Sequence, residues 1–185
     1  MWPVLKWFVG GVALLLLIVL LFRGPLFRMF FHFEDLRERH TGRTFPTPSG
    51  PDTTQEEVPL PVGMCIDAAL DETARLLEFT DGPALSSAAG SRRTGKANCI
   101  GYAALFQERC RWLLDSAGFA DEWQVHHLRG SLYLGDLNVH RLFSSPFWKD
   151  HDICAVENIA TGQCRFVDPS LFDVTGIRRV RGPAN

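Results

Sequence analysis

An apolar run near the N-terminus, WFVGGVALLLLIVLLF from Trp7 to Phe22, constrains this chain more than any other feature. It holds 16 residues without a charge and is bounded by Lys6 and Arg23. Both flanking side chains can extend toward water, and the residues before Lys6 are mostly apolar, so the run approaches the roughly 20 residues that cross a bilayer. We therefore expect one transmembrane anchor over residues 1–24. Because no small-x-small cleavage site follows, we expect it to be retained.

The distribution of basic residues suggests an orientation for this anchor. Lys6 and the α-amino group precede the run, whereas five arginines follow it: Arg23, Arg28, Arg37, Arg39 and Arg43. The positive-inside rule then favours the cytoplasmic face for the rest of a single-pass membrane protein. Residues 25–33, PLFRMFFHF, fit either a membrane-surface segment or a helical extension of the anchor.

A change of composition separates the anchor from the folded part. Between Arg43 and Val62 the chain carries prolines at positions 46, 48, 51, 59 and 61 among Thr, Ser, Gly and acidic residues. Such a stretch cannot bury a core and tends to be extended. We assign 25–62 to a juxtamembrane segment and Pro-rich linker, and 63–185 to one domain, which is long enough to bury a core.

Hydrophobic periodicity predicts helices first and strands afterwards. Apolar residues from Ile66 to Leu77 follow a helical period, residues 84–97 suggest a loop, and a second helix runs from the N-cap Asn98 to Gly118. The predicted strands are Glu122–Leu128, Ser131–Leu134, Asp136–Leu142, His151–Glu157 and Arg165–Asp168. This order predicts an α+β domain with an antiparallel sheet.

Composition narrows the functional classes. The formal net charge of −2 and the lack of a nucleic-acid motif argue against nucleic acid as a partner, and the basic cluster from Arg178 to Arg181 is typical of a solvated tail. The five cysteines are odd in number and lack the spacing of a disulfide scaffold, so at least one thiol should be free.

Cys99 is the best candidate for a reactive thiol. It directly follows the N-cap Asn98 and so lies in the first turn of the second helix. Unpaired backbone amides and the helix dipole favour a thiolate there, and the same amides could bind an oxyanion. Cys110 lies within the apolar stripe of that helix and fits a structural role instead.

His151 and Asp168 are placed to complete the site. Alternation puts His151, Ile153 and Ala155 on one face of their strand and turns Cys154 to the other. If the last two strands pair so that Ala155 faces Cys164, then His151 faces Asp168, close enough for the carboxylate to orient the imidazole. A thiol, an imidazole and a carboxylate so arranged form a nucleophile, a base and an orienting group.

Three segments resemble the transglutaminase-like cysteine enzymes of the papain-like superfamily. Asn98 to Phe106, NCIGYAALF, is similar to the nucleophile helix; His151 to Glu157, HDICAVE, to the histidine strand; and Phe166 to Ser170, FVDPS, to the Asp-Pro-Thr/Ser element. Their order and spacing also match, over about residues 63–175. Two positions depart from the pattern, with Ile153 where Trp is common and Asn98 where a small or acidic residue is usual.

The resemblance implies a transglutaminase/papain-like core with Cys99 as nucleophile, His151 as base and Asp168 as orienting group. It implies acyl transfer from a peptide or glutamine amide through a thioester, with no metal or organic cofactor. We favour hydrolysis of a peptide or protein substrate over cross-linking, because excluding water requires a specially built tunnel. The alternatives are a catalytically silent binding module and a membrane-tethered scaffold.

The other histidines and a zinc site are weaker candidates for function. His126, His127 and His140 lie on predicted strands, where ordinary surface or core roles are favoured. The spacing of His151 and Cys154 is suggestive of zinc, but residues three apart on a strand face opposite ways, and no CxxC pair completes a ligand set.

Overall fold

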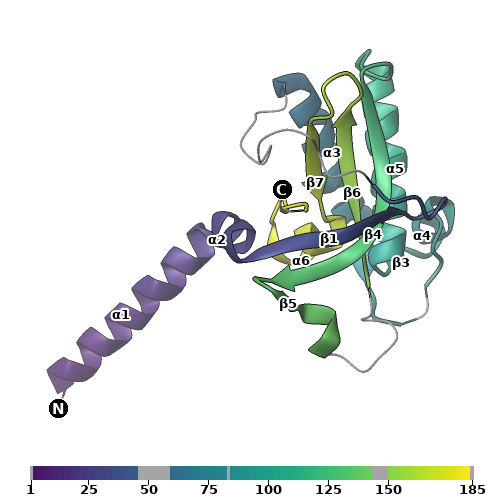
Figure 1. The fold of residues 1–185 in the computed structure, drawn as a ribbon. Helices are drawn as coiled ribbons and strands as arrows, with labels where there is room; N and C mark the ends of the chain where they lie inside the picture. The colour runs from purple at the N-terminus through teal and green to yellow at the C-terminus, as the bar shows by residue number, and fades with distance from the viewer. Residues whose placement is uncertain (1, 46–58, 83, 143–149, 184–185) are drawn as a thin grey trace.

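Six helices and seven strands make up the described part of the chain, residues 2–45, 59–82, 84–142 and 150–183 of a computed structural model (Figure 1). The helices are α1 Trp2–Leu21, α2 Arg23–Phe30, α3 Leu60–Leu76, α4 Ala88–Thr94, α5 Cys99–Ser116 and α6 Pro169–Thr175. The strands are β1 Phe31–Glu38, β2 Glu78–Phe79, β3 Lys96–Ala97, β4 Trp123–Leu134, β5 Leu137–Asn138, β6 His151–Asn158 and β7 Cys164–Val167. A 3₁₀ turn, η1, spans Val139–Leu142.

The main sheet is antiparallel, which confirms the predicted α+β class. Its strand order is β1-β4-β6-β7, and β5 pairs with β4. Strands β2 and β3 form a separate parallel pair. Because successive side chains on β4 and β6 point to opposite faces, the sheet carries a core on each side.

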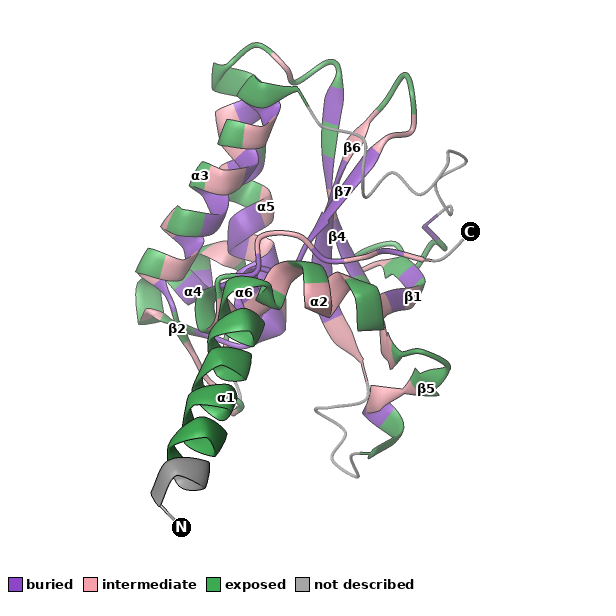
Figure 2. Cartoon of the chain, turned by 90° about the vertical axis from the view of Figure 1, so that its left-hand side faces the viewer, coloured by how far each residue is buried: buried purple, intermediate pink, exposed green. Residues whose placement is uncertain are grey.

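Helices α3 and α5 cover one face of the sheet (Figure 1). Both helices carry apolar residues at helical spacing, and these side chains are buried against alternate residues of the strands (Figure 2). The core on this face includes Val62, Ile66, Leu70, Ala103, Phe106, Cys110, Val125, Cys154, Val156 and Val167.

Chain segments without regular structure help to cover the other face. Phe45 and Val180 pack there with Ile153 and Phe166, and the amide of Val180 donates to the carbonyl of Phe166 at 3.0 Å. A Cβ at Gly182 would lie 2.3 Å from the Phe166 ring, so the backbone passes directly over that ring. The C-terminal basic segment is therefore packed against the sheet and is not the solvated tail that the sequence suggested.

Strand β1 belongs to the domain although the sequence assigned it to the juxtamembrane segment. It pairs with β4, and its side chains Phe33 and Leu36 are buried. A bulge at Asp35, where φ is +55°, shifts the register and brings two residues three apart onto the same face. Because the bulge breaks the two-residue alternation, the sequence pattern does not indicate a strand here. The folded unit therefore begins well before Gly63, whereas linker residues 46–58 lie outside the described residues.

Four other elements differ from the predictions. In place of the predicted strand Asp136–Leu142, the chain forms the two-residue strand β5 followed by the 3₁₀ turn η1. Residues 84–97, predicted as a loop, contain α4, which begins at the N-cap Ser87 and ends at Gly95 in the left-handed conformation. One continuous strand, β4, replaces two predicted strands, because nothing interrupts it at Arg129 and Gly130. Asp168 and Pro169 begin α6 and do not merely end a strand, since Asp at the N-cap and Pro in the first turn are both favourable helix starts.

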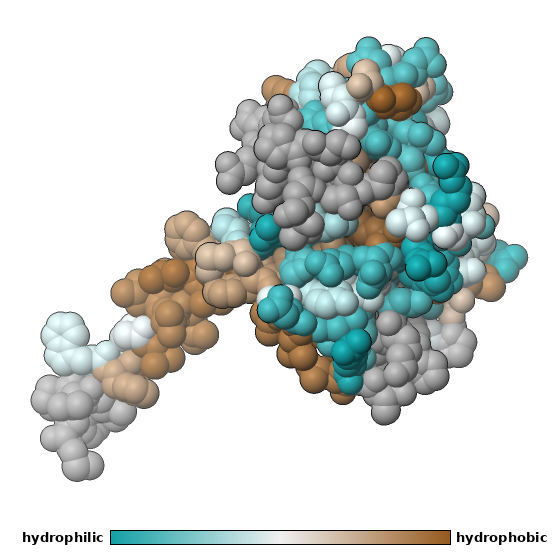
Figure 3. Space-filling view, viewed as in Figure 1, coloured by the Kyte–Doolittle hydropathy of each residue, from teal (hydrophilic) through white to brown (hydrophobic). Residues whose placement is uncertain are grey.

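Helix α1 projects away from the domain, and its apolar side chains are exposed from Trp7 onward (Figures 2 and 3). Within the described residues, no single helix combines the length and hydropathy needed to cross a membrane. Lys6–Leu21 and Arg23–Phe30 reach that length and composition only as a pair, which is bent by 76°. An apolar surface of this extent is typical of a contact with a membrane or a partner.

Candidate active site

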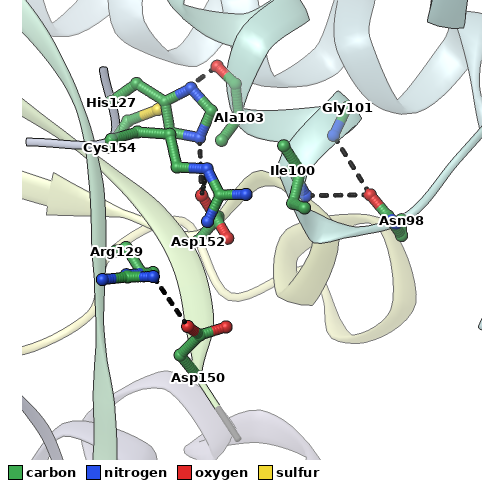
Figure 4. A network of polar contacts seen from close by, with 10 residues as sticks. Asn98, Ile100, Gly101, Ala103, His127, Arg129, Asp150, Asp152 and Cys154 are labelled. Atoms are coloured by element: carbon green, nitrogen blue, oxygen red, sulfur yellow. Dashed lines mark hydrogen bonds and ion pairs between the residues drawn. The ribbon is translucent and has the colours of Figure 1, made fainter. Parts of the chain in front are cut away.

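The first turn of α5 holds Cys99. The Asn98 side chain caps this helix, and its Oδ1 accepts hydrogen bonds from the amides of Ile100 at 3.1 Å and Gly101 at 3.3 Å (Figure 4). The cap explains why the helix begins here. It also engages two of the amides that the sequence suggested for an oxyanion site, so neither of those two is available for that role.

Gly101 lets the start of α5 lie close to α4 and β3. A Cβ at this position would lie 2.4 Å from Ser91 Oγ and 2.7 Å from Ala97 Cβ. Only glycine fits such an approach without a shift of the neighbouring elements. The position of the Cys99 backbone therefore depends on this contact.

His151 and Asp168 are in contact, but in a different strand register from the predicted one. Ala155 pairs with Phe166 and not with Cys164, which offsets β6 and β7 by two residues. The cause is the turn: Asn158 Oδ1 accepts two turn amides, and a longer loop ends at Gly162. An offset of two keeps each residue on its face. His151 Nε2 lies 2.8 Å from Asp168 Oδ2, although Asp168 comes one residue after β7.

The Cys99 thiol lies beside the same imidazole, and its interaction with His151 is among the causes that raise the pKa of His151. Because Nε2 binds Asp168, Nδ1 is the ring nitrogen left for the thiol. The Phe33 ring stacks on the imidazole, with the centroids 5.9 Å apart. The structure thus brings all three predicted residues together, from the helix start, the strand and the helix cap.

Electrostatics hold the imidazole and the carboxylate as an ion pair. Burial by itself lowers the pKa of His151, but the Asp168 charge, its hydrogen bond and the contact with Cys99 outweigh burial and raise the pKa well above its usual value. Burial alone raises the pKa of Asp168, yet the charge and hydrogen bond of His151 lower it overall. The imidazole and the carboxylate therefore each stabilise the charged form of the other.

Helix α6 fixes the carboxylate of Asp168. Its Oδ1 accepts from the Leu171 amide at 3.0 Å and from Ser170 Oγ at 2.8 Å, which leaves Oδ2 for His151. The buried Tyr102 hydroxyl, three residues after Cys99, donates to Asp173 Oδ2 at 2.6 Å. This bond ties α5 to α6 and raises the pKa of Tyr102 in addition to the effect of burial. The helices that position the Cys99 thiol and the Asp168 carboxylate are thereby held in a fixed arrangement.

A pocket of about 340 Å³ lies next to this site, and His151 and Asp168 line it. Its other walls come from α2, β1, β2, β4, η1 and α6: Phe27, Phe33, Phe79, Leu132, Val139, His140, Ser170, Leu171 and Val174. Most of these residues are ordinary apolar side chains that meet only in the folded chain, so the sequence pattern does not indicate them. His140, to which the sequence gave an ordinary role, is buried at this pocket.

A second His–Asp pair lies on the helix-covered face of the sheet. His127 Nε2 is 2.9 Å from Asp152 Oδ1, and both side chains are only 1% exposed (Figure 4). His151 is 20% exposed by comparison and reaches the pocket. The buried pair is closed to a substrate, which agrees with the core role expected for His127. His126 instead bridges Glu38 and Glu157.

The remaining cysteines have no comparable setting. All five thiols are free. Burial raises the pKa of Cys110 and Cys164 to about 12 and also raises the pKa of Cys65 and Cys154. Cys154 faces α5 and donates to the Ala103 carbonyl at 3.4 Å. These four thiols are therefore protonated at neutral pH and poor nucleophiles.

Comparisons with known proteins give no independent family assignment. No family model matches the sequence, and neither the curated proteins nor the solved structures gave a match. Within the described residues, no group of three His, Cys, Asp or Glu side chains could hold a metal ion.

Proposed function

We propose that this chain is a membrane-anchored, transglutaminase-like cysteine enzyme that transfers an acyl group from an amide through a thioester on Cys99. The observation that carries the proposal is that one imidazole, His151, binds the Asp168 carboxylate and lies beside the Cys99 thiol at the edge of a pocket. This arrangement has the three parts of a nucleophile, a base and an orienting group.

The chemistry follows from these positions. His151 takes the proton of the Cys99 thiol, and the thiolate attacks the amide carbonyl. The backbone amide of Cys99 itself is the donor that we expect to face the developing oxyanion. His151 then protonates the leaving amine, which gives an acyl thioester. Asp168 keeps the imidazole oriented and stabilises its cation. His151 next takes a proton from water, which attacks the thioester and releases the acid and the thiol.

Hydrolysis of the thioester is favoured over its transfer to an amine. His151 is partly exposed and lines an open pocket, so water can reach the thioester. The exposed apolar surface of α1 supports attachment of the enzyme to a membrane, and the arginines that follow this helix favour the cytoplasmic face.

Turnover of a panel of peptide aminomethylcoumarin amides by the full chain in detergent micelles tests the proposal. Cys99→Ser and His151→Gln should each lower turnover by about 100-fold or more. Cys65→Ser, a change at a half-buried thiol outside the site, should leave it unchanged. Turnover that survives Cys99→Ser would refute the proposal. Folded protein with no Cys99-dependent turnover would favour the binding module or the membrane-tethered scaffold.

A further inference from the structure

The pocket beside His151 offers a substrate hydrocarbon walls and few polar groups. Its polar lining residues are His140, His151, Asp168 and Ser170. The last three already bind one another, because Ser170 Oγ donates to Asp168, which also binds His151. A peptide backbone would bring amides and carbonyls that need partners, whereas an alkyl chain needs none.

The pocket adjoins an apolar surface that continues to α1. Val174 lines the pocket and is still 72% exposed. Exposed apolar side chains flank the lining residues of α2, β4 and η1: Met29, Phe30, Leu134, Leu137 and Leu142. Figure 3 shows this hydrophobic surface passing from α1 over α2 and reappearing at the tip of the β4–β5 hairpin. A chain leaving a bilayer beside α1 would therefore meet apolar side chains over α2 and again beside the pocket.

Positive charge gathers at the same junction. The Arg23 guanidinium packs against Gly176, where a Cβ would lie 2.7 Å from Nη2. Burial lowers the pKa of Arg28, and the nearby charge of Arg179 lowers it further. In the part of the chain that the structure describes, none of these three arginines forms an ion pair with a carboxylate. Like charges left unpaired beside an apolar helix suit an anionic lipid headgroup.

We infer that the substrate is the acyl group of an anionic membrane lipid, a fatty acyl amide or ester whose chain fills this pocket while its carbonyl meets Cys99. This inference rests on the proposed function and names its substrate class. The thiolate attacks the acyl carbon, the C–N or C–O bond breaks, and His151 protonates the departing amine or alcohol. Water then hydrolyses the thioester, which releases the fatty acid and restores the thiol.

A series of N-acyl aminomethylcoumarin amides, from acetyl to dodecanoyl, tests the pocket in the micelle-bound full chain. Because each methylene leaves water on binding, kcat/KM should rise about fourfold per methylene until the pocket is full. Val174→Trp, at a lining residue exposed enough to tolerate the change, should lower the octanoyl-to-acetyl ratio about tenfold or more. Ile159→Trp, at an exposed residue of the β6–β7 turn, is the matched control and should keep the ratio.

The outcomes separate the two claims. A flat series, or a leucyl peptide amide preferred over the octanoyl amide, would overturn the inference while Cys99-dependent turnover upholds the proposed function. No Cys99-dependent turnover of any amide would overturn both.

The lipid source is tested with the full chain in phosphatidylcholine vesicles with and without phosphatidylglycerol. Mass spectrometry should find the acyl chain of the vesicle lipid on Cys99, more of it with phosphatidylglycerol, and less after Arg28→Gln with Arg179→Gln. If octanoyl amide is turned over but neither vesicle acylates Cys99, a membrane lipid is excluded as the substrate.

Discussion

Asp168 divides its two carboxylate oxygens between two tasks. Oδ1 caps α6 and Oδ2 binds His151. Because one residue fixes both the helix and the imidazole, a change that keeps the cap but removes the charge isolates the ion pair. Asn is such a change, since its side-chain oxygen remains a good N-cap acceptor.

We predict that Asp168→Asn lowers the free energy of unfolding by about 1.5–3 kcal/mol near pH 5.5, because a buried charged hydrogen bond is lost. The His151 contribution is fully present below the usual pKa of 6.5 and is lost as pH rises through its raised pKa. The Asp168 contribution is present above 3.8 and is lost as pH falls through its lowered pKa. Urea unfolding across pH should therefore show that the difference in unfolding free energy between the wild type and Asp168→Asn becomes smaller at low pH and at high pH.

Asp71→Asn is the control, because Asp71 is exposed and pairs with the surface residue Arg178. It should change the unfolding free energy by less than about 0.5 kcal/mol. An Asp168→Asn difference that stays constant from pH 4 to pH 10 would contradict the ion pair.

Gly101 gives a second prediction at the level of one residue. Gly101→Ala should destabilise the protein by about 1–3 kcal/mol and slow the reaction of Cys99, because the new Cβ would displace the first turn of α5 from Ser91 and Ala97. Gly63→Ala, within α3, meets only the end of the Arg165 side chain at 3.4 Å. It should be neutral or stabilising by up to about 1 kcal/mol. Thermal unfolding of both variants checks this, and equal effects would count against the close approach.

At the level of elements, β1 decides where the domain begins. A chain that starts at Arg23 keeps β1 and should unfold cooperatively, whereas a chain that starts at Gly63 loses the buried Phe33, Leu36 and Phe45 and should not fold. Near-ultraviolet circular dichroism and a thermal melt distinguish the two. A cooperative melt of the shorter chain would show that β1 is not part of the folded unit.

Local sequence signals predicted the elements that they control. Asn98 and Gly118 bracket α5, and the alternation from His151 to Glu157 gave the correct faces of β6. The predicted register of β6 and β7 was wrong, because the register depends on how the Asn158 side chain closes the turn. Alternation of apolar and polar residues does not reveal this. The sequence does not predict strand β1, because the bulge at Asp35 breaks its two-residue period.

At the scale of the whole molecule, α1 sets the location of the domain. We predict that the full chain stays in the membrane fraction after alkaline carbonate extraction, because the exposed apolar side chains from Trp7 to Phe22 need a nonpolar environment. The chain that starts at Arg23 should be extracted. Recovery of the full chain in the soluble fraction would contradict the anchor.

The pairing of Cys99 with His151 could be predicted only as a compatible set of positions. The two residues are far apart in sequence, and their contact depends on how α5 and β6 pack. The pocket could not be predicted at all, because Phe27, Leu132 and Val174 are unremarkable in sequence and meet only when α2, β4 and α6 come together.

The most direct test of the central claim is the rate at which iodoacetamide alkylates Cys99 at pH 6.5, followed peptide by peptide by mass spectrometry in the full chain. We predict that Cys99 reacts faster than the buried Cys110, Cys154 and Cys164, and that His151→Gln slows it about tenfold or more. Cys65→Ser should leave the Cys99 rate unchanged. Equal Cys99 rates in the wild type and in folded His151→Gln would contradict activation of the thiol by His151.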